Sequence, residues 1–177
     1  MANRPVFEVM EQAMFFRRVD IDFTFYNGFS FQQKQRCIRS LHGSYREMTG
    51  NDKILEVSGK SDNPLGIALS EFNLSMVDEQ GKRLTVEALF QRCKDNSPIN
   101  PPTYFFDWLY VNALHQNPDL AEEVAKYKAF TDIEFNPARQ NNCPAEAAAI
   151  YVGLKTSGKL ELALKDKDTF RRVVFEK

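Results

Sequence analysis

The chain has 177 residues, of which 43% are hydrophobic and 27% are charged. Its 15 Phe residues indicate a well-filled core, so the chain is expected to fold and not to remain disordered. Because 23 basic residues are balanced by 24 acidic ones, the net charge is −1 and a broad cationic field is excluded. Any contact with DNA is therefore expected to be local.

The first part of the chain is predicted to contain one strand and one long helix. From Val19 to Phe25, apolar residues alternate with polar ones, which is the pattern of a strand covered on one face. Ser30 is the predicted N-cap of a helix that runs to Met48, with Gln33 three residues after the cap. The side chains along this helix include Phe31, Gln35, Ile38 and Leu41.

A short strand, a loop and a hairpin are predicted next. Residues 54–58 form the strand, and the polar segment 59–66 forms the loop. Residues 67–84 are expected to be extended, with a hairpin turn at Glu79, Gln80 and Gly81. Thr85 then begins a helix as its N-cap, and this helix continues to Lys94.

The second half of the chain is predicted to be mostly helical, with helices at 103–114, 118–130 and 143–158. The proline-rich segment 95–102 and the polar segment 131–142 are expected to be loops, and residues 166–177 a short helix or strand. The whole chain, residues 1–177, is thus predicted to be a single compact α+β domain that is mostly helical, with a small antiparallel sheet.

The sequence contains none of the familiar catalytic signatures, such as a Walker loop, GxGxxG, GxSxG or HExxH. Its three cysteines are odd in number and lack metal-ligand spacing, so neither a metal site nor a cofactor is expected. This cysteine usage indicates a reduced, cytoplasmic setting. The N-terminus does not resemble a signal peptide, and no apolar run approaches the ~18 residues of a membrane span.

The predicted helix from Thr85 to Lys94 carries polar side chains along the margin of its apolar face. At 100° per residue, Glu87 and Lys94 lie on nearly the same side two turns apart, with Gln91 between them. Such a margin is either a solvated edge or the wall of a pocket. The helix dipole alone favours an acidic residue at Glu87, and Lys94 has the common alternative of a surface lysine. A half-buried carboxylate in a cleft would suit acid–base chemistry, so Glu87 is the leading candidate.

Two other stretches contain candidate binding residues. Ser70, Phe72 and Asn73 place an aromatic ring beside a hydroxyl and an amide, which could stack on a base and bind a ribose. Their alternative is a strand with Phe72 facing the core. Asp132 and Asn136 precede a predicted helix start whose backbone N–H groups could accept a phosphate. Their alternative is ordinary turn and capping chemistry.

The segment from Leu69 to Lys94 resembles the signature of the NADAR superfamily. The first element of the signature reads Leu69-Ser70-Glu71-Phe72-Asn73 here, and the helix that follows reads Thr85-Val86-Glu87 through Phe90-Gln91 to Lys94. The resemblance extends to one branch, the NADAR antitoxins encoded beside DNA ADP-ribosyltransferase (DarT-type) toxins. The stretches similar to that branch are MANRPVF, GFSFQQKQRCIRSLH, LEVSGKS, FFDWLYVNAL and FTDIEFNPARQNNC.

This resemblance implies an N-glycosyl hydrolase that removes ADP-ribose from a modified DNA base and thereby acts as an antitoxin. Glu87 would be the acid–base group or would stabilise the cation-like sugar, and Lys94 would contact or attack the opened ribose. The nucleotide pocket would be lined by Ser70, Phe72, Asn73 and Gln91, while ribose or phosphate would be held by Asp132 and Asn136. The expected partners are ADP-ribose or an ADP-ribosylated nucleobase, and a cognate toxin.

The sequence departs from this branch in one segment. The branch has a longer, Gly-rich insert with a tryptophan after the lysine of the signature, whereas this chain has only Asp95–Pro102. A shorter wall would leave the site open or would change the choice of substrate. A second hypothesis is therefore a protein without catalysis that binds ADP-ribose, a related nucleotide or a toxin.

Overall fold

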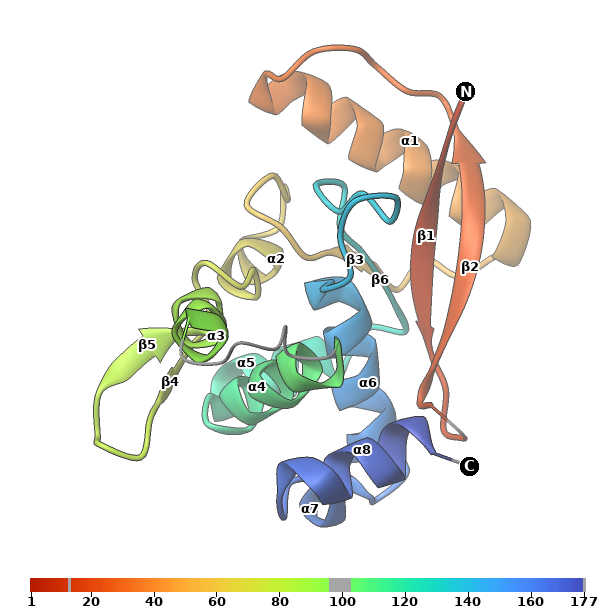
Figure 1. The fold of residues 1–177 in the computed structure, drawn as a ribbon. Coiled ribbons are helices and arrows are strands. Elements are labelled where there is room, and N and C mark those ends of the chain that lie inside the picture. The colour runs from red at the N-terminus through yellow and green to blue at the C-terminus, as the bar shows by residue number, and fades with distance from the viewer. Residues whose placement is uncertain (13, 96–102, 177) are drawn as a thin grey trace.

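The computed structural model describes residues 1–12, 14–95 and 103–176. Its main sheet has four strands in the order β2-β1-β6-β3 (Figure 1). These strands are β1 (Ala2–Val9), β2 (Phe16–Phe23), β3 (Ile54–Glu56) and β6 (Ala129–Thr131). β1 pairs antiparallel with both β2 and β6, whereas β3 and β6 run parallel. The α+β class is confirmed, and the sheet is mixed because of this parallel pair.

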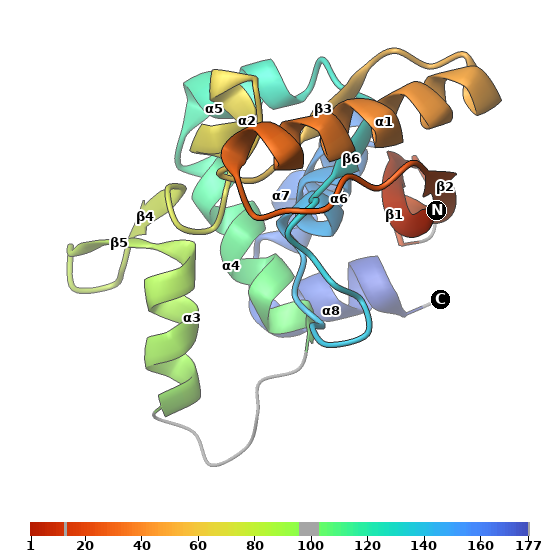
Figure 2. The ribbon, with the colours of Figure 1, turned by 90° about the horizontal axis from the view of Figure 1, so that it is seen from above.

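Both faces of the sheet are buried, since successive residues of β1, β3 and β6 belong to two different apolar clusters. Val6, Ile54 and Ala129 pack on one side with helix α1 (Phe31–Thr49). Phe7, Leu55 and Phe130 pack on the other side, where helices α4 (Thr103–His115) and α6 (Pro144–Thr156) lie. Figure 2 shows α1 and these helices on opposite sides of the strands.

The helices of the second half of the chain follow the predicted order, except that one is shorter and a short additional helix precedes the last one. α4 (Thr103–His115) and α6 (Pro144–Thr156) form as expected, and Gly158 ends α6 with a φ of 74°. The C-terminal segment is helical, in α8 (Lys167–Phe175) after the short α7 (Leu160–Ala163). α5 is shorter than predicted, at Pro118–Val124. Within the described residues, no helix has the length and hydropathy needed to cross a membrane.

Two predictions about strands were wrong. The predicted helix 118–130 includes the beginning of β6, whose Ala129 and Phe130 are fully buried between β1 and β3. A three-residue strand buried on both faces shows no alternation of polar and apolar residues, so the pattern gave no signal for it. β2 ends at Phe23, and Phe25 is 39% exposed although the alternation placed it on the buried face. β1 was not predicted.

A second, two-stranded sheet precedes the helix that carries Glu87. β4 (Ser75–Val77) and β5 (Arg83–Thr85) form the predicted hairpin, and Gly81 in its turn has a φ of 80°. α3 (Val86–Asp95) follows directly, and the Thr85 hydroxyl accepts a hydrogen bond from the Ala88 amide at 3.1 Å. Before the hairpin, residues Pro64–Ala68 form the short helix α2, where a loop and then an extended segment were predicted. The helix forms because Asn63 caps it and Pro64 occupies its first position.

α6 approaches the end of the β1–β2 hairpin so closely that only glycine fits at one position. A Cβ atom on Gly153 would lie 2.5 Å from the backbone oxygen of Phe15 and 2.6 Å from that of Met10. Gly43, in the middle of α1, has no neighbouring atom within 4 Å of the same position. Substitution of Gly153 by alanine therefore tests the packing of α6, whereas the same substitution at Gly43 tests helix propensity alone.

We predict that Gly153→Ala lowers the free energy of unfolding by about 1–3 kcal/mol, because the new methyl group forces α6 away from the hairpin. Gly43→Ala is the matched control and should raise it by roughly 0.5–1 kcal/mol, the usual helix preference for alanine. Chemical denaturation of both variants measures the difference. Equal stabilisation by the two substitutions would contradict the close approach of α6.

Candidate functional site

The carboxyl ends of the parallel strands β3 and β6 lie together at one edge of the main sheet. Glu56, the last residue of β3, is only 2% exposed. One of its carboxylate oxygens accepts a hydrogen bond from the Thr131 hydroxyl at 2.7 Å, and the other accepts one from the Ile133 amide at 2.8 Å. These two bonds fix the backbone on either side of Asp132, so Glu56 positions the Asp132 carboxyl.

His42 of α1 completes this buried network. Its Nε2 atom lies 2.8 Å from the Thr131 hydroxyl oxygen. Burial and, to a lesser extent, the nearby Arg46 lower the pKa of His42 to about 4. The ring is therefore neutral at neutral pH, and its contact with Thr131 is part of the packing between α1 and the sheet.

The turn that carries the predicted binding residues 70–73 is held against α3 and α4. The Tyr110 hydroxyl of α4 donates a hydrogen bond to the Leu69 carbonyl at 2.6 Å. At the other end of the turn, the Val86 amide donates to the Leu74 carbonyl at 2.9 Å. The Glu87 amide donates to the Glu71 carbonyl at 3.0 Å. The beginning of α3 is thus joined to the turn, and Glu71 and Glu87 become neighbours.

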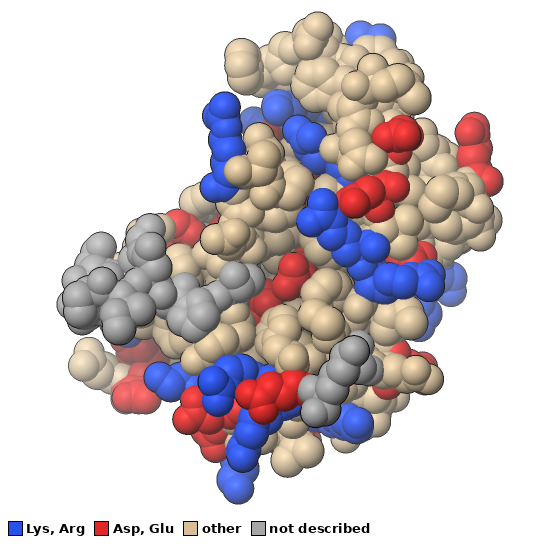
Figure 3. All heavy atoms as spheres, turned by 45° about the vertical axis from the view of Figure 1, so that its right-hand side comes forward, with Lys and Arg blue, Asp and Glu red and all other residues tan. Residues whose placement is uncertain are grey.

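Three acidic side chains from separate elements interact electrostatically in this region, Glu87 with Glu71 and Glu71 with Asp132. The pKa of Glu71 is raised by burial and further by the charge of Glu87. The pKa of Asp132 is raised well above its usual range by burial and then by the charges of Glu56 and Glu71. Glu71 therefore connects Glu87 on α3 with Asp132 beyond β6. Figure 3 shows one face of the molecule, on which Asp and Glu side chains lie among Lys and Arg side chains.

The predicted binding residues of the turn differ in exposure. Ser70 is buried, and its hydroxyl accepts a hydrogen bond from the Asn73 side-chain amide at 3.2 Å, so these two residues are brought together. The same amide donates to the Ile67 carbonyl at 2.9 Å. Phe72 is 65% exposed, which excludes the alternative that it faces the core from a strand.

On α3, Glu87 is half-buried and its carboxylate accepts a hydrogen bond from the Gln91 side-chain amide at 2.8 Å. The backbone of Lys94 continues the same helix, but its side chain lies outside the described part of the chain, as does most of the shortened segment Asp95–Pro102. Asn136 accepts a hydrogen bond from the Ala138 amide at 3.0 Å, which is the turn chemistry given as its alternative.

The sequence did not single out Glu71, Glu56 or Tyr110 as site residues. Glu71 lies inside the stretch that carries the family resemblance, so its type and position were visible, but its burial was not. Glu56 ends a three-residue strand, and Tyr110 lies in a helix whose apolar character identified only burial. Their roles depend on contacts between residues far apart in the sequence.

A second pair of acids lies between α4 and α6. Asp107 is fully buried, and within the described residues no group donates a hydrogen bond to either of its oxygens. Burial and the adjacent carboxylate of Glu146, in the first turn of α6, raise the pKa of Asp107 well above its usual range. A protonated Asp107 can donate a hydrogen bond to the Glu146 carboxylate, so that one of its oxygens gains a partner. The proton also removes the repulsion between the two negative charges.

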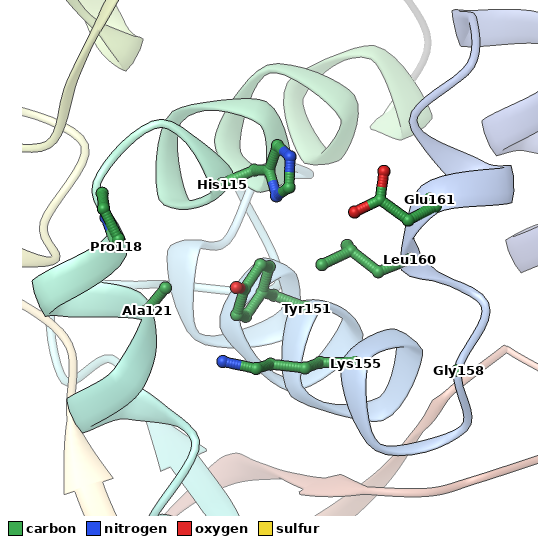
Figure 4. Close-up of a pocket in the computed structure, with 8 residues that line it drawn as sticks. All are labelled: His115, Pro118, Ala121, Tyr151, Lys155, Gly158, Leu160 and Glu161. Carbon is green, nitrogen blue, oxygen red and sulfur yellow. The ribbon is translucent and has the colours of Figure 1, made fainter.

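A separate hollow of about 410 Å³ lies where the ends of α4 and α6 meet α5 and α7 (Figure 4). Its polar side chains are those of His115, Tyr151, Lys155 and Glu161. In Figure 4 the His115 ring and the Glu161 carboxylate lie on one side of the hollow, and Tyr151 and Lys155 of α6 on another. These groups come from the ends of helices and not from the sheet edge or the turn that carry the predicted residues.

Comparison with known families gives one match. A family model described as DarT1-associated NADAR antitoxin matches residues 2–96 and 93–177, which together cover almost the whole chain. The two matched segments meet at residues 93–96, where the shortened segment begins. A comparison with curated proteins finds no match.

We predict that Asp107→Asn changes the melting temperature in a pH-dependent way. The wild-type carboxyl binds its proton more tightly when folded, so its contribution to stability is lost as the pH rises above the unfolded pKa of about 3.9 and through the folded value. The amide does not titrate. The Tm of the variant minus that of the wild type should therefore increase between about pH 5 and pH 8.

Asp119→Asn, at an exposed position in the first turn of α5, is the control for this measurement and should not show this increase. The titration of His42 is common to all three proteins and cancels in the comparison. A Tm difference for Asp107→Asn that does not change with pH would contradict the raised pKa.

Proposed function

Because the chain belongs to the DarT1-associated NADAR antitoxins, we propose that it is an N-glycosyl hydrolase that removes ADP-ribose from a modified DNA base. Family membership supports the antitoxin role and a cognate toxin as partner. The reaction is supported by the electrostatic interaction of Glu71, in a turn, with both Glu87, at a helix start, and Asp132, after a strand end.

Cleavage of an N-glycosidic bond leaves a cation-like sugar and a base that must accept a proton. A carboxyl group that retains its proton near neutral pH can serve as the acid, and an ionised one can stabilise the cation. Burial raises the pKa of Asp132 and Glu71 in this cluster, which favours their protonated forms. Acids with different environments can therefore supply both a proton for the departing base and a negative charge for the cation-like sugar.

Glu87 is the residue to which we assign the acid–base or cation-stabilising role. Its carboxylate is half-buried, and the bond from the Gln91 amide fixes its orientation. Lys94 follows after two helical turns, so its Cα lies on nearly the same side of α3. We assign to Lys94 a contact with the opened ribose or an attack on it as an amine.

The remaining predicted residues are assigned to binding. Ser70, Phe72 and Asn73 occupy the turn beside Glu71, and the exposed ring of Phe72 is free to stack on a base or nucleotide. Asp132 and Asn136 were predicted to hold ribose or phosphate. For Asp132 ribose is the better choice, because its neighbours Glu56 and Glu71 would repel a phosphate.

The second candidate function is binding without catalysis. It is favoured by the division of the family match at residues 93–96 and by the short segment that follows. In that case the protein would hold ADP-ribose or its cognate toxin and would release no product.

We predict that Glu87→Ala reduces the release of ADP-ribose from ADP-ribosylated DNA by at least about 100-fold, the usual lower range for a positioned acid–base group. Glu79→Ala removes an exposed glutamate from the β4–β5 turn and should leave the rate unchanged. Chromatography of the released ADP-ribose measures both rates. An unaltered rate for Glu87→Ala would remove this residue from the mechanism.

Calorimetry with ADP-ribose separates the two candidate functions. A hydrolase should bind its product measurably and also turn over the modified DNA. Tight binding of ADP-ribose by a protein that releases none from ADP-ribosylated DNA would support the binding function. Failure to bind ADP-ribose would count against the hydrolase and against nucleotide binding, and would leave only the binding of a toxin.

A further inference from the structure

The loop between β2 and α1 exposes aromatic side chains to solvent. Phe29 is 94% exposed, Phe31 is 43% exposed and Phe25 is 39% exposed. Single exposed apolar residues are common on protein surfaces, but here three phenylalanines within seven residues are exposed. Such a concentration of exposed rings requires a reason, because it lowers solubility and contributes little to the core.

Hydrogen bonds and a cation–π contact with α1 stabilise the conformation of this loop without the exposed phenylalanines. The Gln33 side-chain amide donates to the Asn27 carbonyl at 2.9 Å, and the Thr24 amide donates to the Ser40 hydroxyl at 3.0 Å. The Arg36 guanidinium lies 4.0 Å from the centre of the Tyr26 ring. The exposed rings are therefore presented by a preorganised backbone.

The loop and the first four turns of α1 together carry an excess of positive charge. From Phe23 to Arg46 the chain has four cations and no acidic residue, although the protein as a whole has a net charge of −1. Arg36 and Arg39 are exposed, whereas Lys34 is largely covered and pairs with Glu134 at 3.8 Å. Around the rest of α1, Asp52, Glu56 and Asp62 line a hollow together with Arg39 and Arg46, and Glu8 accepts a hydrogen bond from Tyr45.

This stretch lies next to the candidate site. The partner of Lys34, Glu134, is two residues from Asp132, and the Glu134 amide donates to the Asp132 carboxylate at 2.9 Å. Figures 1 and 2 both show the beginning of α1 passing the loop that follows β6. A chain bound along this surface would therefore reach the acidic cluster.

We propose that Phe25, Phe29, Phe31, Arg36 and Arg39 form a surface, here called the aromatic–basic surface, that binds single-stranded DNA flanking the modified base. Exposed aromatic rings stack on unpaired bases of any sequence, and neighbouring cations contact the phosphates. In a duplex the faces of the bases are already stacked, so a single strand is the form that these rings can bind. This inference rests on the proposed function for the identity of the bound strand.

Binding of an unmodified, fluorescein-labelled single strand of about 12 nucleotides, followed by fluorescence anisotropy, tests the aromatic part of the surface. Phe29→Ala should weaken binding at least about 5-fold, the lower end of what stacking on one base contributes. Met48→Ala is the matched control, since Met48 is 61% exposed at the far end of the same helix, and it should bind as the wild type does. Because Phe29 is almost fully exposed, its substitution should leave the fold intact.

The salt dependence of the same binding tests the cations. Arg39→Gln should reduce the slope of log K against log salt by about 0.7, the value for one phosphate contact on a single strand. Lys165→Gln, between α7 and α8, removes an exposed cation elsewhere and should leave the slope unchanged. Equal slopes for Arg39→Gln and the wild type would contradict the assignment of Arg39.

Hydrolysis distinguishes a failure of this inference from a failure of the proposed function. Phe29→Ala should raise the KM for an ADP-ribosylated oligonucleotide and leave turnover of an ADP-ribosylated nucleoside unchanged. If Phe29→Ala binds the oligonucleotide as tightly as the wild type, the inference is wrong, whatever Glu87→Ala shows. Loss of binding to the cognate toxin with unchanged DNA affinity would assign the surface to the toxin and would also overturn the inference.

Discussion

Carboxyl groups that are buried close together cannot all be ionised, and this constraint governs the region around the ends of β3 and β6. Glu56 is buried there because a hydroxyl and a backbone amide donate to its two oxygens. Asp132 lies between those two donors in the sequence and is placed by them. Because ionisation is unfavourable in this region, the pKa values of Glu56, Glu71 and Asp132 are raised.

The same constraint connects structure with the proposed chemistry. A cluster that holds protons more tightly than solvent-exposed acids do can deliver one to a departing base. Joining the turn at Glu71 to the first residues of α3 makes Glu87 a neighbour of Glu71, which interacts in turn with Asp132, although Glu87 and Asp132 are 45 residues apart in the sequence. The main sheet, the turn and α3 must therefore all be in place before a site exists.

Local signals in the sequence predicted much of the helical structure. Ser30 and Thr85 act as caps, and Gly158 ends α6 through its positive φ, because each of these effects involves only neighbouring residues. β6 was missed because its short segment is buried on both faces and is defined by strands from distant parts of the chain. α2 was missed because a loop-like composition concealed an Asn cap followed by proline.

The candidate site was predictable only in part, and mainly through the family resemblance. Helical spacing placed Glu87 and Gln91 on one margin of α3, and they are hydrogen bonded there. Spacing could not reveal that Glu71 joins Glu87 to Asp132, because this relation depends on the packing of the turn. Nor did the alternation of residues 19–25 indicate that Phe25 is exposed, as Phe29 and Phe31 are.

Backbone amide chemical shifts during a titration with ADP-ribose test most directly whether the turn, the start of α3 and the loop after β6 form one site. The account predicts that the largest shift changes fall together in residues 69–74, 86–91 and 131–136. Changes concentrated around His115, Tyr151 and Glu161, with the three segments unaffected, would place the ligand in the hollow of Figure 4 and would contradict it.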